Sequence, residues 1–147
     1  MEKKIAKIIS VLFHPLLIPT YALLLLFSTN YYFVLVLPDK YRYLLLSFVF
    51  ITSFVLPGLM MLILLRAKMI NSLQMESQDE RVVPMILVSG FFFATYYFLR
   101  EAPHTEVYNF FMLGATILVL ISLLINYLTK ISIHMVAQGG LFGTFLG

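Results

Sequence analysis

Long apolar stretches separated by short polar segments make up most of the chain. A helix needs about 20 mostly apolar residues to cross the hydrocarbon core of a bilayer. By that measure the pattern predicts four complete membrane spans and the beginning of a fifth. The expected spans cover residues 16–37, 44–65, 85–99 and 110–128, and the partial fifth covers residues 131–147. The predicted fold class is therefore all-α, a polytopic transmembrane helix bundle that forms a single transmembrane domain over residues 1–147.

The residues ahead of the first span follow a different pattern. Residues 5–37 are mostly apolar, which is too long for one simple span. Pro15 and Pro19 predict a bend or a helix start within this stretch. Before them, apolar residues recur at helical spacing opposite three lysines, so we expect a short N-terminal interfacial helix. These apolar residues are Ile5, Ile8, Ile9 and Leu12.

The composition supports a membrane protein and argues against a soluble domain, a disulfide-linked or thiolate metal protein and a nucleic-acid-binding protein. Hydrophobic residues make up 61% of the chain and charged residues 12%, against roughly 25% charged in soluble domains. The absence of cysteine excludes disulfides and thiolate metal sites. The net charge is +3, but no basic run exceeds two residues, so we expect no nucleic-acid partner. Seven of the ten Lys and Arg residues fall on the N-terminal side of the predicted topology, which favours a cytoplasmic N-terminus.

The segment "KISIHMVAQGG", residues 130–140, places three polar side chains at the mouth of the last apolar stretch. If Ser132 is the N-cap of a helix and His134 lies in its first turn, both side chains and the free N–H groups converge. A helix N-terminus attracts phosphate, and Lys130 would add positive charge beside it. The alternative is that Lys130 is a membrane anchor, Ser132 only a cap and His134 an interfacial residue.

The segment "ESQDERVVP", residues 76–84, is the second candidate. Ser77 followed by Glu80 reads as a capping box before the third span. Arg81 then lies near the headgroup level, where an arginine can bind phosphate in a bidentate way or simply anchor the helix. Two spans separate Arg81 from Ser132, so parity puts both residues at the same membrane face.

Taken together, "RVVP" at a span entrance and "KISIH" about fifty residues later resemble the first two motifs of the type 2 phosphatidic acid phosphatase superfamily. This superfamily contains the lipid phosphate phosphatases and is related to the vanadium haloperoxidases. The whole chain, including "FHPLLIPTY" near its start, resembles a divergent bacterial membrane branch of it. The first motif of the family is Lys, six residues, Arg, Pro. Arg81 matches its arginine, whereas position 74 is Gln and the proline comes only at Pro84, so the lysine role is left to Lys68 or Lys130.

The second motif of the family is Pro-Ser-Gly-His, and Ser132 and His134 match its serine and histidine. The resemblance implies that Arg81, Lys130 and Ser132 bind a lipid or isoprenoid phosphate and that His134 is a catalytic residue, which protonates the leaving oxygen. It implies no metal and no other cofactor, and a location in the bacterial cytoplasmic membrane.

The third motif of the family carries an arginine, the nucleophilic histidine and an aspartate, and the residues after His134 include none of the three. By the resemblance, residues 1–147 are expected to be the N-terminal part of a longer phosphatase-like domain and to be inactive alone. His14 and His104 are the other histidines. Parity puts His104 on the opposite face, and His14, beside Pro15, is expected to have a structural or interfacial role. The alternative function is a non-enzymatic helical membrane protein with a structural or binding role.

Two further features have simple alternatives. Gly139, Gly143 and Gly147 are spaced by four, which predicts a close helix–helix contact with a partner helix inside or outside this chain. A polar cluster in the loop after the third span could hold a metal, but a solvated loop is the simpler interpretation. Its members are Arg100, Glu101, His104 and Glu106.

Overall fold

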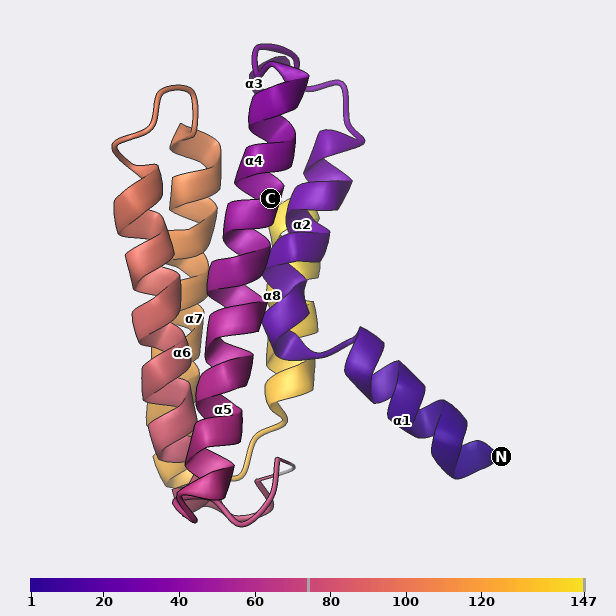
Figure 1. Cartoon of the computed structure of the whole chain (residues 1–147), viewed down its shortest axis with the longest axis vertical. Helices are drawn as coiled ribbons and strands as arrows, with labels where there is room; N and C mark the ends of the chain where they lie inside the picture. Colours follow the sequence, from indigo (N-terminus) through magenta and orange to yellow (C-terminus); the bar gives the residue numbers. More distant parts are fainter. Residues whose placement is uncertain (74, 147) are drawn as a thin grey trace.

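The computed structural model describes residues 1–73 and 75–146, apart from the side chain of Phe33, and in this part of the chain all regular structure is helical. Four helical stretches are long and apolar enough to cross a membrane. The predicted all-α transmembrane bundle is therefore confirmed (Figure 1). The helices are α1 (Glu2–Leu12), η1 (Pro15–Leu17), α2 (Ile18–Phe27), α3 (Tyr32–Leu35), α4 (Asp39–Phe50), η2 (Ile51–Val55), α5 (Leu56–Arg66), α6 (Gln78–Leu99), α7 (Glu106–Leu128) and α8 (Ile133–Leu146).

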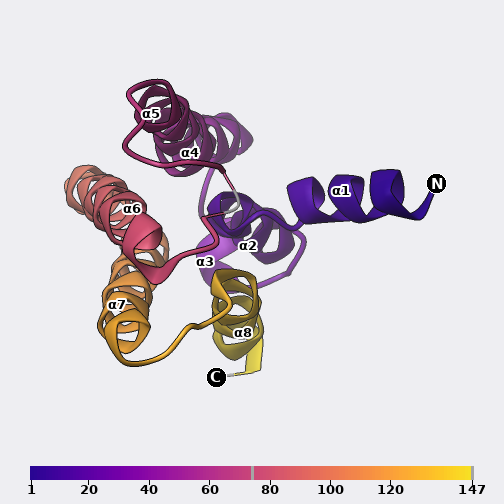
Figure 2. The ribbon, with the colours of Figure 1, turned by 90° about the horizontal axis from the view of Figure 1, so that it is seen from below.

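The N-terminal helix α1 is a separate element, as the pattern predicted, and it projects sideways from the lower end of the bundle (Figures 1 and 2). None of its residues is buried, and Ile8 on its apolar face is 59% exposed. The chain breaks after Leu12 because His14 precedes Pro15 and takes an extended conformation, which a residue before proline favours. An exposed amphipathic helix at the end of a bundle fits a place in the membrane interface.

The first span ends earlier than predicted. Instead of running to residue 37, α2 ends at Phe27, and a turn and the short helix α3 follow. The hydroxyl groups of Ser28 and Thr29 donate hydrogen bonds to the carbonyls of Leu25 and Leu26, each at 2.6 Å. These bonds satisfy two carbonyls that the last turn of a helix leaves open, so the helix can stop inside an apolar sequence.

The second span is one continuous rod of three parts, α4, η2 and α5, with η2 a π-helical turn. Pro57 lies in the first turn of α5, where its missing N–H breaks the regular bonding pattern, and the π turn directly before it absorbs the mismatch. Thr52, inside η2, donates its hydroxyl to the carbonyls of Phe48 and Val49. The span therefore passes Pro57 through a π turn and stays helical.

The second, third and fourth spans begin earlier than the apolar pattern indicates. The helices α4, α6 and α7 start at Asp39, Gln78 and Glu106, whereas the predicted spans start at residues 44, 85 and 110. Each of these first turns contains an acidic side chain, which the positive end of the helix dipole stabilises. A polar first turn therefore belongs to the helix although it does not belong to the apolar stretch.

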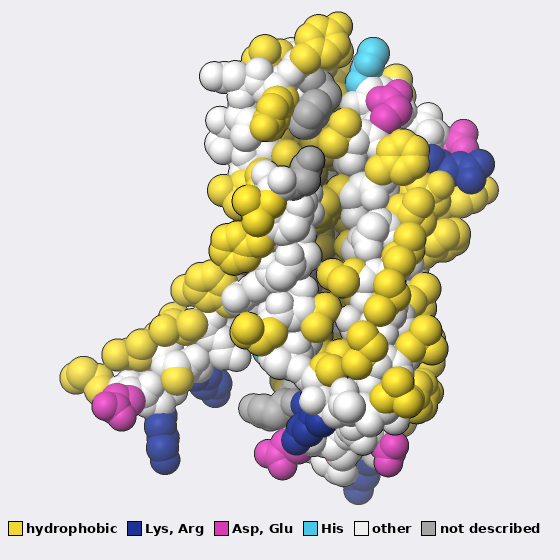
Figure 3. Space-filling view, turned by 180° about the vertical axis from the view of Figure 1, so that it is seen from behind, with side chains coloured by type: hydrophobic (Ala, Val, Ile, Leu, Met, Phe, Trp, Pro, Cys, Tyr) yellow, Lys and Arg dark blue, Asp and Glu magenta, His cyan; other side chains and the backbone are white. Residues whose placement is uncertain are grey.

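The helices α6 and α7 form the main antiparallel pair, and α2 and α4 pack beside them. A buried cluster joins these four helices with the segment before α4: Leu23, Leu26, Leu37, Leu45, Val49, Phe92, Leu99, Tyr108 and Met112. On the face that Figure 3 shows, hydrophobic side chains cover the length of the bundle, and charged ones gather at its two ends. This distribution is what a bilayer around the bundle requires.

The last helix, α8, packs against α7, α2 and η1, and none of its residues is buried. Gly140 makes the close approach to α7: a Cβ built there would lie 2.6 Å from Cδ2 of Leu118. Gly139 and Gly143 have open space at the same position, and Gly147 lies outside the described residues. Within the described chain, Gly140 and not Gly139 or Gly143 therefore makes the close contact with α7. A partner beyond this chain for Gly139 and Gly143 stays a prediction.

Candidate functional site

One cavity of about 1420 Å³ lies between α1, η1, α2, α6, α7 and α8. Its apolar walls come from residues such as Met85, Phe92 and Phe111. Ten residues with basic, imidazole or hydroxyl side chains also line it: Lys7, Ser10, His14, Tyr31, Arg81, Ser122, Lys130, Ser132, His134 and Thr144. The four residues singled out in the two sequence motifs therefore face one cavity, although they come from separate elements.

Arg81 connects the two motifs directly. Its Nη1 donates a hydrogen bond of 2.6 Å to the carbonyl oxygen of Ile131, and its Nε donates one of 2.8 Å to the carbonyl oxygen of Met75. Nη2 makes no hydrogen bond within the described part of the chain. The side chain is only partly buried, and Nη2 is the nitrogen whose donors are left for a ligand.

Hydrogen bonds at the first turn of α6 fix the helix segment that carries Arg81. Ser77 caps the helix and accepts a hydrogen bond of 3.3 Å from the backbone N–H of Glu80. The second half of the predicted capping box does not form, because the Glu80 carboxylate accepts a hydrogen bond from Asn71 in the preceding loop. Asn126 of α7 donates to the carbonyl of Gln78 at 3.1 Å. The first turn of α6 is thus tied to the loop before it and to the end of α7.

Ser132 stands directly before α8, in the place predicted for a cap. Its Oγ accepts a long hydrogen bond of 3.5 Å from the backbone N–H of Met135. Ser132, Lys130 and His134 are all exposed, and all three line the cavity. The first turn of α8 therefore opens into the cavity beside Lys130, at the same end of the bundle as Arg81.

His14 lies beside His134, with their ring centroids 6.0 Å apart and the rings at 73°. His14 is half-buried, and its Nδ1 accepts a hydrogen bond of 3.3 Å from the backbone N–H of Leu16, which caps η1. The predicted structural role of His14 is therefore seen as a cap. Its position next to His134 was not anticipated from the sequence.

Sequence reasoning also missed Lys7 and Ser10, which line the cavity from α1. The available signal was their spacing: residues 7 and 10 are three apart on one helix and so share a face. Of the two lysines proposed for the missing motif lysine, Lys130 lines the cavity and Lys68 is not among its lining residues. Gln74, the position of that lysine in the family motif, lies outside the described residues.

The charged side chains that line the cavity are all basic among the described residues. Among the described residues that line it, three are Lys or Arg and none is Asp or Glu. Uncompensated basic groups around a partly apolar cavity favour an anion, and backbone amides at the start of α8 act in the same direction. The cavity is therefore suited to a ligand with an anionic group and an apolar body.

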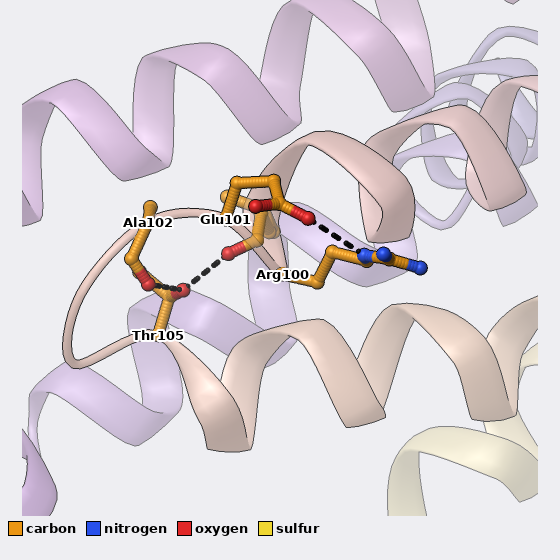
Figure 4. Close-up of polar contacts among 5 residues, drawn as sticks. Arg100, Glu101, Ala102 and Thr105 are labelled. Carbon is orange, nitrogen blue, oxygen red and sulfur yellow. Dashed lines mark hydrogen bonds and ion pairs between the residues drawn. The ribbon is translucent and has the colours of Figure 1, made fainter.

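The polar cluster at the opposite end of the bundle is built differently (Figure 4). Arg100 donates to the Glu101 carboxylate at 2.9 Å, and this bond raises the pKa of Arg100 above its ordinary value. Thr105 donates its hydroxyl to the carbonyls of Leu99 and Ala102. No group of three or more metal-ligating side chains occurs in the described residues. These bonds join the ends of α6 and α7 through a short loop.

Comparison of the chain with family models, with curated proteins and with solved structures found no match.

Proposed function

We propose that this integral membrane protein binds the phosphate group of a lipid or isoprenoid phosphate, in the manner of the phosphatidic acid phosphatases it resembles. The observation that carries the proposal is the cavity: Arg81, Lys130, Ser132 and His134 line it together, and no described lining residue is acidic. A phosphate monoester carries up to two negative charges and several acceptor oxygens, and these residues offer donors of the matching kind.

Each polar residue has a chemical role in this proposal. Nη2 of Arg81 donates to one phosphate oxygen, while Nη1 stays on Ile131 and Nε on Met75. Lys130 supplies a second positive charge, and the Ser132 hydroxyl donates to another oxygen. His134 is the residue that can hand a proton to the ester oxygen at neutral pH.

The rest of the cavity suits a hydrocarbon chain. Its lining on α7 runs from Val107 to Ser122, which is about 22 Å along a helix at about 1.5 Å per residue. Small residues, among them Gly114, Ala115 and Ala137, leave room along this path. A ligand with a phosphate at the polar end and an apolar chain along α7 would bury both parts in suitable surroundings.

The proposal covers binding of the phosphate and not its hydrolysis. Transfer of the phosphoryl group needs a nucleophile, which the family takes from a motif that residues 1–147 do not contain. His14 is the other histidine of the cavity, but its Nδ1 lone pair accepts the N–H of Leu16, so the proton of the neutral ring is on Nε2. Neither nitrogen then offers a free lone pair, and we propose phosphate binding without hydrolysis for these residues.

The test is a binding titration of the chain in lipid nanodiscs with dioctanoyl phosphatidic acid. Dioctanoylglycerol is the matched ligand without phosphate, and inorganic phosphate is the matched ligand without chains. We expect the phosphatidic acid to bind at least about tenfold more tightly than either one, because a hydrogen bond to a charged group contributes about 1.5–3 kcal/mol. Equal binding of the phosphatidic acid and the glycerol would reject the proposal.

One observation favours the alternative, a non-enzymatic membrane protein whose polar residues only hold the fold. Two nitrogens of Arg81 already bind backbone carbonyls, which is a structural role in itself. The two functions differ at His134, which is exposed and makes no hydrogen bond within the described residues. Substitution His134→Ala weakens phosphatidic acid binding if the cavity is a site, and changes nothing if the polar residues are structural.

A further inference from the structure

His14 occupies a position that the proposed function does not use. It lies between α1 and η1, lines the cavity, and has its ring 6.0 Å from that of His134. His134 comes from α8, 120 positions further along the chain. The two imidazoles therefore meet through folding at the end of the cavity where the basic side chains are.

The hydrogen bond to Leu16 fixes what the His14 ring can do. An Nδ1 that accepts a backbone N–H is unprotonated, so the neutral ring carries its proton on Nε2. An imidazole held in this tautomer offers a hydrogen-bond donor at Nε2 and no acceptor there. The half-buried ring is also held by its cap bond, so little rotational freedom is lost when Nε2 finds an acceptor.

The N-terminal helix adds to this side of the cavity. Lys7 and Ser10 of α1 line the cavity with His14, and all three side chains carry donors. No described lining residue carries a carboxylate that could take these donors instead. The side of the cavity formed by α1 and η1 therefore offers donors without an acidic partner, as the side formed by α6 and α8 does.

We propose that His14 is an anion-binding residue of this cavity: its Nε2–H donates to an oxygen of the phosphate that Arg81, Lys130, Ser132 and His134 bind from the other side. This inference rests on the proposed function and extends it, because it makes the start of the chain part of the site. His14 is then both the cap of η1, through Nδ1, and a ligand-binding residue, through Nε2.

Two substitutions separate these two roles. In His14→Asn the amide oxygen stands close to where Nδ1 was, so the cap of η1 is kept and the donor at Nε2 is lost. In His14→Gln the amide nitrogen reaches the place of Nε2, so the donor is kept and the cap is lost. If His14 binds the ligand, His14→Asn weakens binding more than His14→Gln. If His14 is only a cap, His14→Gln weakens binding more than His14→Asn.

The experiment uses the full chain in nanodiscs, titrated with dioctanoyl phosphatidic acid, with inorganic phosphate and dioctanoylglycerol as the two partial ligands. Thermal unfolding of each variant is followed by circular dichroism. We expect His14→Asn to weaken phosphatidic acid binding by about tenfold or more with an unchanged unfolding midpoint. We expect His14→Gln to bind within about threefold of the unsubstituted chain although its midpoint falls.

The outcomes separate the two proposals. If the unsubstituted chain does not prefer phosphatidic acid to dioctanoylglycerol, the proposed function fails, and this inference fails with it. If the preference exists and His134→Ala removes it, but His14→Asn binds as tightly as the unsubstituted chain, only the role of His14 is overturned. Loss of binding in His14→Gln together with retention in His14→Asn would assign His14 to the cap alone.

Discussion

Arg81 of α6 donates a hydrogen bond of 2.6 Å from Nη1 to the carbonyl oxygen of Ile131, fifty residues later in the chain. This bond connects the first turn of α6 with the segment that leads into α8, which contains Lys130, Ser132 and His134. No described residue of α8 is buried, so core packing does little to fix the position of this helix. The hydrogen bond from Arg81 to Ile131 therefore helps to hold α8 in place.

Arg81→Ala should therefore affect both binding and structure. We expect phosphatidic acid binding to fall by about tenfold or more, because a charged donor is lost. We also expect the segment before α8 to become more mobile, because the carbonyl of Ile131 loses its donor. Hydrogen–deuterium exchange of the backbone amides around residues 130–136 measures the second effect, and a lipid titration measures the first.

The matched control is Arg66→Ala, which removes a positive charge at the end of α5 from an exposed residue outside the cavity lining. We expect it to leave both measurements unchanged. Equal losses in the two variants would mean that general positive charge at this end of the bundle, rather than Arg81, attracts the lipid.

Residues 1–147 should not hydrolyse phosphatidic acid in the absence of metal. The physical reason is that these residues lack the nucleophilic motif of the family. Of the two cavity histidines, His134 has the proposed role of proton donor, and Nδ1 of His14 already accepts the N–H of Leu16. Release of inorganic phosphate from nanodiscs that contain the lipid is the measurement. Phosphate release that disappears in His134→Ala would contradict this expectation, and empty nanodiscs give the background.

Arg42→Ala should destabilise the end of the bundle around α3. Arg42 donates from Nε to the carbonyl of Leu37 at 2.9 Å and from Nη2 to the carbonyl of Val34 at 2.8 Å. Both residues that provide these carbonyls are buried. We expect the free energy of unfolding, measured by titration with sodium dodecyl sulfate, to fall by about 1.5–3 kcal/mol.

Asp39→Ala is the control for that measurement. Its carboxylate lies 3.4 Å from Nη1 of Arg42, but the side chain is 82% exposed, and an exposed ion pair contributes only about 0–1 kcal/mol. We expect little change in stability. If Asp39→Ala costs as much as Arg42→Ala, the ion pair rather than the bonds to the carbonyls holds this end together.

Gly140→Ala should loosen the contact between α8 and α7, because the added Cβ would stand 2.6 Å from Cδ2 of Leu118. Overfilling of a packed contact costs about 1–3 kcal/mol, and the flexible end of Leu118 can give way, so we expect about 1 kcal/mol. The unfolding midpoint of the purified chain measures the effect.

Gly143→Ala is the control for the same helix, since its Cβ position is open. The double variant Gly140→Ala with Leu118→Ala removes the clash, and we expect it to lose less stability than the sum of the two single changes. Additive losses would show that Gly140 and Leu118 do not restrict one another.

The two ends of the bundle should lie on opposite sides of the membrane, with the N-terminus in the cytoplasm. The chain has no cysteine, so single-cysteine variants label cleanly. We expect a membrane-impermeant maleimide to reach Glu101→Cys in intact cells and Glu76→Cys only after lysis. The reverse pattern would invert the orientation, and labelling of both in intact cells would contradict the predicted number of crossings.

The sequence by itself determined the class of the fold and the end of the bundle at which each polar segment lies. Every backbone group in a bilayer must be hydrogen-bonded inside its own helix, so the length of each span can be read from the local sequence. Counting the spans between two polar segments then tells whether they lie at the same end of the bundle. That was enough to place Arg81 with Ser132 and Arg100 far from both. The sequence-based prediction was wrong about the end of α2 at Phe27. The side-chain hydrogen bonds of Ser28 and Thr29 compete with continuation of the helix, and a pattern of hydrophobic residues does not show such bonds.

Only the tertiary structure decided which side chains meet. The spans are apolar on nearly all sides, so nothing in their sequence marks the face that turns inward, and packing between neighbouring helices sets the rotation of each. That rotation brings Gly140 rather than Gly139 or Gly143 against α7, and it puts the carbonyl of Ile131 within reach of Arg81. It also brings His14 beside His134, because their contact depends on how α8 packs against η1 and α2.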